Sequence, residues 1–360
     1  MQTRFITLDG VRGLAAVMVM ALHLQMILGG PFFAHGYLMV DLFFLMSGFV
    51  LSAGYGARLA QPGAGPGFAR ARLIRLYPLA LVGLALGSAV QAYGAARGVM
   101  HPPPQWALIG GLSVLFLPWL GGGLIVPFNG PIWSLQLELW INGLYGAVAP
   151  RLTDLRLWGL IAACGVGLTG VSLWLGQFDG GFANHDPSRH AGDFAYLIGW
   201  LRVGFSFPLG VALHRLWRAG RLRIAAPGSL GWLVPATVGL IAFIPVVASP
   251  LFDLGVVGAA FPLLLVCAAQ AEPSKAARLY ARAGRLSYGL YVIHGPVVVF
   301  FHTLEPAGAS LAVRLCLVTA AAGVSIGAAW AAERWIDAPA RRWAAGPTRE
   351  RRSAAVAASA

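Results

Sequence analysis

The sequence predicts an all-α polytopic integral membrane protein with about ten transmembrane helices that enclose a polar cavity. Of its 360 residues, 58% are hydrophobic and only 11% are charged, and the mean hydropathy is +0.71. A soluble domain has about 25% charged residues. Long apolar runs approach the length that crosses a bilayer as a helix. The arginines cluster between these runs, which is typical of a multi-pass membrane protein.

Ten apolar runs separated by polar segments are the expected spans. They cover residues 8–28, 38–56, 76–96, 131–149, 155–176, 194–213, 230–248, 251–270, 286–303 and 311–333. Segment 105–128 is also apolar, but it is short and rich in Gly and Pro. We expect it to be re-entrant or to lie at the outer surface, since non-spanning backbone at membrane depth must be buried in protein or line a cavity.

The distribution of positive charge supports this topology. With ten spans, all of the 26 lysines and arginines except Arg97, Arg189, Arg202 and Arg314 fall on one side. The positive-inside rule makes that side cytoplasmic, together with both termini. A crossing at 105–128 would separate the arginines at 215–223 and 275–285 from those at 4–12 and 58–75. The net charge of +13 therefore indicates topology, and nucleic acid is not expected as a partner.

Residues 1–343 are expected to form one membrane domain, and residues 344–360 a disordered basic cytoplasmic tail. The outer loop 177–193 is rich in Asp and His, and is either a solvated loop or a contact surface for a polar acceptor. The three cysteines are isolated, so no metal site is expected. Lysine occurs once, at Lys275, a bias that suggests a GC-rich bacterial genome. The expected location is the bacterial cytoplasmic (inner) membrane.

The first span carries the most informative pair of residues. Arg12 and His23 are ionisable residues in an apolar run, where such residues persist mainly to line functional cavities. Their separation of eleven residues is three helical turns plus about 20°, so both side chains leave the same face. They stand about 16 Å apart along the axis. A neutral imidazole at that depth can act as general base on a hydroxyl.

Four further polar residues are expected deep in the spans. Asp41 and Glu138 each need a cationic partner: each either forms an ion pair that fixes helix packing, or orients His23 or contacts the acceptor. Arg202 needs a carboxylate or carbonyl partner that the sequence does not identify. His294 is expected to make a second polar contact in the cavity.

Three arginines, Arg70, Arg72 and Arg75, open the third span at the cytoplasmic side. They either anchor a helix by the positive-inside rule or bind phosphate, which suits the guanidinium group. With Arg12 near the same surface, they could hold the phosphates of a cytosolic donor while its reactive end points toward His23.

Six motifs in order resemble the membrane-bound acyltransferase 3 family, the integral-membrane O-acyltransferases of bacterial surface glycans and antibiotics. The resemblance covers about residues 5–343. The motifs are Arg12-x10-His23, Asp41-Leu-Phe-Phe-Leu-Met-Ser-Gly48, Arg70-Ala-Arg72 with Arg75-Leu-Tyr-Pro78, Trp133-Ser-Leu-x-x-Glu138, Ser287-Tyr-Gly-Leu-Tyr-x-x-His294, and Glu333 through Arg341.

The resemblance implies transfer of an acyl group, usually acetyl, from cytosolic acyl-CoA to a hydroxyl of a saccharide. The saccharide could be a surface polysaccharide, a lipid-linked sugar or a glycosylated small molecule. The expected catalytic residues are His23, Glu138 and Asp41. The expected donor-binding residues are Arg12, Arg70, Arg72 and Arg75, and the expected acceptor-side residues are His294, Arg202 and Trp133. Many members carry a further secreted hydrolase-like domain, which is not expected here.

Direct transfer and a covalent acyl intermediate both remain open. A transporter or flippase of a lipid-linked or anionic substrate is the main alternative, with the same buried charges lining its path. A membrane sensor is a third alternative, and would tolerate His23→Gln.

Overall fold

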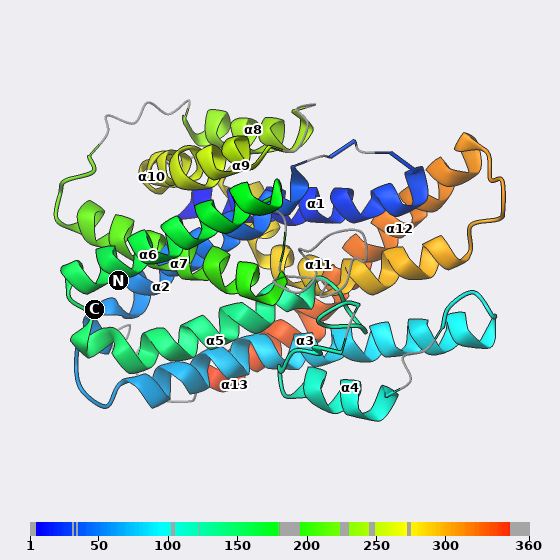
Figure 1. Cartoon of the computed structure of the whole chain (residues 1–360), viewed down its shortest axis with the longest axis horizontal. Helices are drawn as coiled ribbons and strands as arrows, with labels where there is room; N and C mark the ends of the chain where they lie inside the picture. Colours follow the sequence, from blue (N-terminus) through cyan, green and yellow to red (C-terminus); the bar gives the residue numbers. More distant parts are fainter. Residues whose placement is uncertain are drawn as a thin grey trace, which may run out of the picture.

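The computed structural model describes residues 5–345, except 31, 34, 102–104, 122, 179, 181–194, 224–229, 245–248 and 272–274. Nearly all of the predicted tail 344–360, and most of the outer loop 177–193, lie outside this range. Helices dominate the described residues, and they lie side by side along one direction (Figure 1). This confirms an all-α multi-pass architecture.

The helices follow the predicted order. They are α1 (Ile6–Leu28), η1 (Gly36–Leu38), α2 (Met39–Leu59), α3 (Gly65–Ala96), α4 (Trp106–Val114), α5 (Ile132–Val148), η2 (Ala149–Arg151), α6 (Asp154–Leu175), α7 (Ala195–Arg218), α8 (Leu230–Phe243), α9 (Pro250–Gly255), η4 (Val256–Ala260), α10 (Phe261–Gln270), α11 (Ala277–Thr303), α12 (Leu311–Ala332), η5 (Glu333–Asp337) and α13 (Ala338–Ala345).

Eight stretches of the described chain are long and apolar enough to cross a membrane. They are α1, η1 with α2, α3, α6, α7, α9 through α10, α11, and α12 through α13. The other two predicted spans correspond to α5 and α8, which have 17 and 14 residues. Helices α3 and α11 begin at Gly65 and Ala277, before the apolar runs at residues 76 and 286. The arginines that precede these two apolar runs are therefore part of the helices.

Segment 105–128 does not form a spanning helix. Its helix α4 has nine residues, about 14 Å of length, which is half of a bilayer core. Tyr77 donates a hydrogen bond to the Val114 carbonyl (2.6 Å), and Trp140 donates one to the Phe116 carbonyl (2.9 Å). The segment is thereby attached to α3 and α5, and several of its leucines are exposed.

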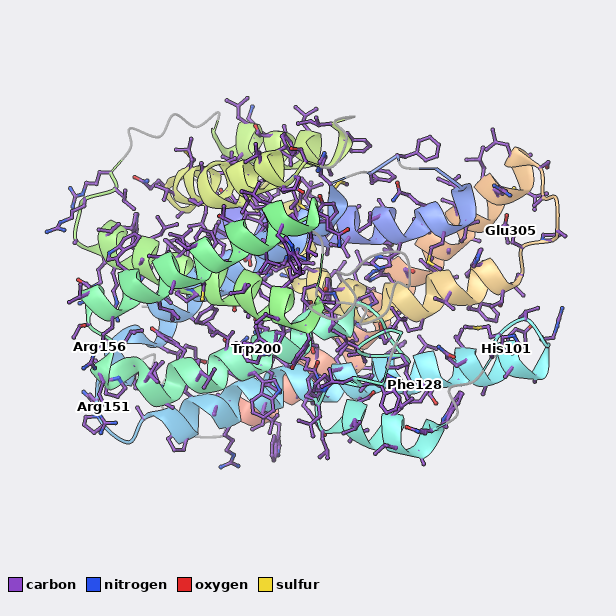
Figure 2. The ribbon with its side chains drawn as sticks, viewed as in Figure 1. His101, Phe128, Arg151, Arg156, Trp200 and Glu305 are labelled. Atoms are coloured by element: carbon purple, nitrogen blue, oxygen red, sulfur yellow. The ribbon has the colours of Figure 1, made fainter. Side chains whose placement is uncertain are left out.

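The two ends of the bundle differ in charge. One end carries Arg151 and Arg156, and the other carries His101 and Glu305 (Figure 2). Arg215, in the last turn of α7, forms an ion pair with Asp154 at the start of α6 (2.7 Å). The C-terminal end of α7 therefore lies at the same end of the bundle as Arg156. We call this the arginine-rich end and the opposite one the Glu305 end.

Glycines bring α1 and α11 into close contact. A Cβ added at Gly13 would lie 2.4 Å from the Cβ of Ala283, and one added at Gly284 would lie 2.7 Å from the Cβ of Asp9. Real Cβ atoms do not approach so closely, so these positions require glycine. Small residues that let backbones approach are a common basis of helix association in membranes.

We expect Gly13→Ala to destabilise the protein, because the methyl group would push α11 away from α1. Gly159→Ala is the matched control in α6, where an added Cβ meets no atom within 4 Å. There the usual gain of about 0.5–1 kcal/mol for Gly→Ala in a helix is expected. Thermal unfolding in detergent measures both. Equal melting temperatures for the two variants would contradict this packing.

Candidate active site

Arg12 and His23 leave α1 on the side that faces α11, in agreement with their eleven-residue spacing. The Arg12 guanidinium donates to Ser287 Oγ (3.2 Å) and to the Gly284 carbonyl (2.9 Å). His23 Nδ1 lies 3.3 Å from His294 Nε2. Both partners belong to α11, although Arg12 and His23 open into different cavities.

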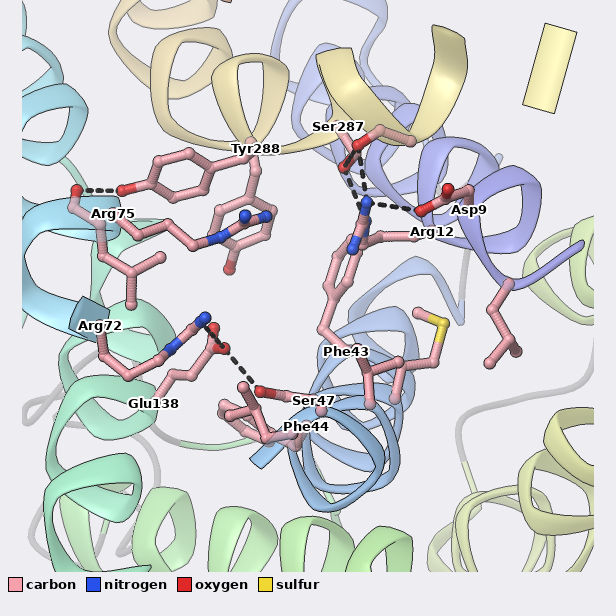
Figure 3. Close-up of a pocket in the computed structure, with 18 of the residues that line it drawn as sticks. Asp9, Arg12, Phe43, Phe44, Ser47, Arg72, Arg75, Glu138, Ser287 and Tyr288 are labelled. Carbon is pink, nitrogen blue, oxygen red and sulfur yellow. Dashed lines mark hydrogen bonds and ion pairs between the residues drawn. The ribbon is translucent and has the colours of Figure 1, made fainter. Parts of the chain in front are cut away.

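The inner cavity, of about 600 Å³, lies toward the arginine-rich end and contains Arg12. Figure 3 shows Arg12 on one wall and Arg72 and Arg75 on the opposite wall. Arg285 and Arg341 also line it. Three acidic residues share the same walls: Asp9, Glu138 and Asp337. The walls therefore carry more arginines than carboxylates.

Arg72 and Arg75 reach the inner cavity, whereas Arg70 does not. The Arg72 side chain is buried, Arg75 is partly buried, and Arg70 is exposed and outside the lining. The helical periodicity explains this difference. Arg70 and Arg72 are about 200° apart around α3, while Arg72 and Arg75 are about 60° apart. The structure thus brings together three of the four predicted donor-binding arginines.

Two of the three predicted donor-binding arginines in the inner cavity have carboxylate partners. Arg12 pairs with Asp9 at 2.8 Å. Arg72 Nη2 lies 3.8 Å from Glu138 Oε1, an oxygen that also accepts a hydrogen bond from Ser47 (2.8 Å). Glu138 therefore contacts an arginine of the inner cavity and does not contact His23.

Arg75 differs from these two arginines. Among the residues that the structure describes, its guanidinium has no hydrogen-bond or ion-pair partner. The inner cavity thus offers a cationic group that is available to an anionic ligand.

The outer cavity, of about 1010 Å³, contains His23 and lies toward the Glu305 end. Its wall is largely apolar, with Val90, Met100, Leu124 and Phe128 among the lining residues. Trp133 and Arg202, two of the predicted acceptor-side residues, also line it. Its polar groups are mostly engaged within the protein. Gln91, for example, donates to the Pro127 carbonyl, and Arg314 pairs with Glu305.

Tyr291 lines both cavities. Its hydroxyl is 2.5 Å from Ser134 Oγ and donates to the Pro131 carbonyl at 3.0 Å. Its ring makes an edge contact with Phe43, with centroids 5.5 Å apart. Tyr291, which is hydrogen-bonded to Ser134, therefore lies between the inner cavity and the outer one. The sequence analysis did not single out either residue, although Ser287, Tyr291 and His294 lie within about 60° of one another on α11.

His294 is placed differently from the prediction of a cavity contact. The side chain is fully buried and lines neither of these cavities. Its contacts are with His23 and with the Leu290 carbonyl, which is 2.9 Å from Nδ1.

Asp41 forms an ion pair with Arg202. Arg202 Nη2 lies 2.6 Å from Asp41 Oδ2, and both side chains are fully buried. Arg202 also donates to the Gly180 and Tyr37 carbonyls and stacks 5.4 Å from the Trp133 ring. Of the two interpretations offered by the sequence, the geometry favours a structural ion pair, which joins α2 to α7. Within the described residues, no group of three or more metal-ligating side chains gathers.

Replacing Arg202 alone with Leu should cost about 3–5 kcal/mol of stability, because it leaves a buried carboxylate unpaired. The double variant Asp41→Leu/Arg202→Leu should be less destabilised than either single variant. Arg215→Leu is the control, because its partner Asp154 is 76% exposed and such pairs contribute about 0–1 kcal/mol. Thermal unfolding in detergent compares Asp41→Leu, Arg202→Leu, the double variant and Arg215→Leu. A wild-type melting temperature for Arg202→Leu would refute the structural role.

The sequence is similar to known proteins. Residues 5–334 match a family described as an acyltransferase domain. The chain is similar to acyltransferase MdmB of Streptomyces mycarofaciens, with 26% identity over 84% of this chain and 81% of that protein. It is also similar to protein 2 in the picA locus of Rhizobium radiobacter, with 39% identity over 42% of this chain and 85% of that protein. No solved structure matches.

The family match includes every residue that lines the two cavities except Asp337 and Arg341. It therefore includes Arg12, His23 and the Tyr291 partition between them. The chain belongs to the acyltransferase 3 family of multi-pass membrane proteins.

Proposed function

We propose that this membrane acyltransferase moves an acyl group, acetyl above all, from cytosolic acyl-CoA to a saccharide hydroxyl. The observation that carries the proposal is that two residues of α1, Arg12 and His23, line two different cavities. Arg12 faces a cationic cavity, His23 faces a larger and mostly apolar cavity, and the two cavities meet at Tyr291. A two-substrate transfer needs a place for each substrate and one point where they meet.

The inner cavity suits the donor. Coenzyme A carries phosphates, and the guanidinium group is well suited to phosphate recognition. Arg75 is available, while Arg12 and Arg72 can exchange their carboxylate contacts for phosphate oxygens. The positive-inside rule makes the arginine-rich end cytoplasmic, which is where acyl-CoA is found. In this orientation both termini are cytoplasmic, and the membrane is the bacterial inner membrane.

The outer cavity suits the acceptor. Its volume is at the upper end of the range for small-molecule sites, about 300–1,000 Å³. Its apolar wall and engaged polar groups favour a saccharide carried on an apolar body, such as a lipid-linked sugar or a glycosylated small molecule. Trp133 offers a flat face to a sugar ring, and Arg202 holds that indole through a cation–π contact.

His23 is the general base in this proposal. Its Nδ1 lies 2.8 Å from the Val19 carbonyl. A carbonyl only accepts, so Nδ1 carries the proton and Nε2 has the free lone pair. Nε2 takes the proton of the acceptor hydroxyl as the oxygen bonds to the acyl carbon. The carbon–sulfur bond then breaks, and the proton passes to the coenzyme A sulfur, giving an ester and free coenzyme A.

The proposal is tested with radiolabelled acetyl-CoA, purified protein and crude cell-envelope glycan. We expect His23→Ala to abolish hydrolysis and label transfer, because the general base is lost. His101→Ala is the matched control, since His101 is exposed at the Glu305 end. Full activity of His23→Ala would contradict this mechanism. Wild-type protein with neither turnover nor saturable acyl-CoA binding would instead favour the transporter alternative.

Donor recognition is tested by comparing two alanine substitutions on one helix. Arg75→Ala should raise the KM for acetyl-CoA by about tenfold or more, since a charge-assisted hydrogen bond contributes about 1.5–3 kcal/mol. Arg70→Ala should change it less, because Arg70 is exposed and outside the cavity. Steady-state kinetics in detergent measures both. A larger effect at Arg70 than at Arg75 would place the donor elsewhere.

A further inference from the structure

The two histidines at the α1–α11 contact form a pair with fixed proton positions. His294 Nδ1 lies 2.9 Å from the Leu290 carbonyl, so Nδ1 carries the proton and Nε2 can only accept. His23 Nδ1 carries a proton by the same argument with Val19. That proton is shared with His294 Nε2 at 3.3 Å, and the two rings meet edge to face with centroids 4.9 Å apart.

In the part of the chain that the structure describes, no carboxylate contacts His23. Asp41 is held by Arg202 and Glu138 lies in the inner cavity with Arg72, so neither can orient His23 as a carboxylate orients histidine in a catalytic triad. His294 is fully buried and does not face either cavity. Its ring therefore acts on His23 and not on a substrate.

We propose that His294 is a positioning residue that fixes the ring orientation of His23 and accepts its Nδ1–H while His23 Nε2 holds the transferred proton. This inference rests on the proposed function. The contact keeps the His23 lone pair directed into the outer cavity before the reaction. When Nε2 is protonated, the acidic Nδ1–H has an acceptor in His294 Nε2 as well as the Val19 carbonyl.

Two amide variants of different length separate this role from a purely structural one. In His294→Gln, the amide oxygen can replace Nε2 as the acceptor for His23. In His294→Asn, the shorter side chain can keep the hydrogen bond to Leu290 but does not reach His23. A positioning role predicts that Gln retains most of kcat. It predicts that Asn loses about tenfold to a hundredfold, by analogy with the loss of a group that orients a metal-ligating histidine.

The KM values for acetyl-CoA and for the acceptor should stay unchanged in both variants, because His294 does not line either cavity. Equal kcat for Gln and Asn, or a selective rise in acceptor KM, would overturn the proposal. The first result would indicate a structural role and the second a substrate contact.

Nitrogen-15 NMR of histidine-labelled full-length protein gives a readout that does not depend on activity. The His23 and His294 signals, assigned from His23→Gln and His294→Gln, should both show a protonated Nδ1 and an unprotonated Nε2. A protonated Nε2 on either ring would overturn the proposal even if transfer occurs. If the NMR signals are as expected but the protein transfers no acyl group, the proposed function is rejected and the arrangement of the two histidines is not.

Discussion

The close packing of α1 against α11 is the constraint on which the site depends. Gly13 and Gly284 let the two backbones approach, and this approach sets one face of α1 against the stripe of Ser287, Tyr291 and His294 on α11. Arg12 and His23 are thereby held in register with these residues. A helix face can present two functional groups about 16 Å apart, but only a rigid neighbour keeps them aligned across the membrane.

The buried charges fall into two groups with different physical roles. Asp41 and Arg202 are fully buried, mutually paired and supplemented by backbone carbonyls. They join α2 to α7 and support Trp133 at the wall of the outer cavity. Arg12, Arg72 and Arg75 instead border an open cavity, where their charges are accessible to a ligand. Burial with a complete set of partners indicates structure, and a cluster of arginines beside a cavity indicates binding.

Much of the fold could be predicted from the sequence, because hydropathy and arginine placement report membrane spans directly. The common face of Arg12 and His23 followed from helical periodicity alone. The same periodicity, applied to Arg70, Arg72 and Arg75, would have separated Arg70 from the other two. These arginines precede the apolar run 76–96, and only the structure shows that α3 already begins at Gly65.

The pairing of distant helices could not be predicted in this way. The sequence around Asp41 does not indicate that its partner is Arg202, 161 positions away. The sequence around Glu138 likewise does not indicate that its partner is Arg72. The partition at Tyr291 and Ser134 likewise depends on how α5 packs near α11. These contacts come from tertiary packing, and a single sequence contains no direct record of it.

The most direct test of the two-cavity account is an experimental structure of the protein with a non-hydrolysable acetyl-CoA analogue in lipid nanodiscs. The account predicts phosphate density beside Arg75 in the inner cavity, with the acyl end passing Tyr291 toward His23. Phosphate density in the outer cavity, or an acyl group that stays on the far side of Tyr291 from His23, would contradict it.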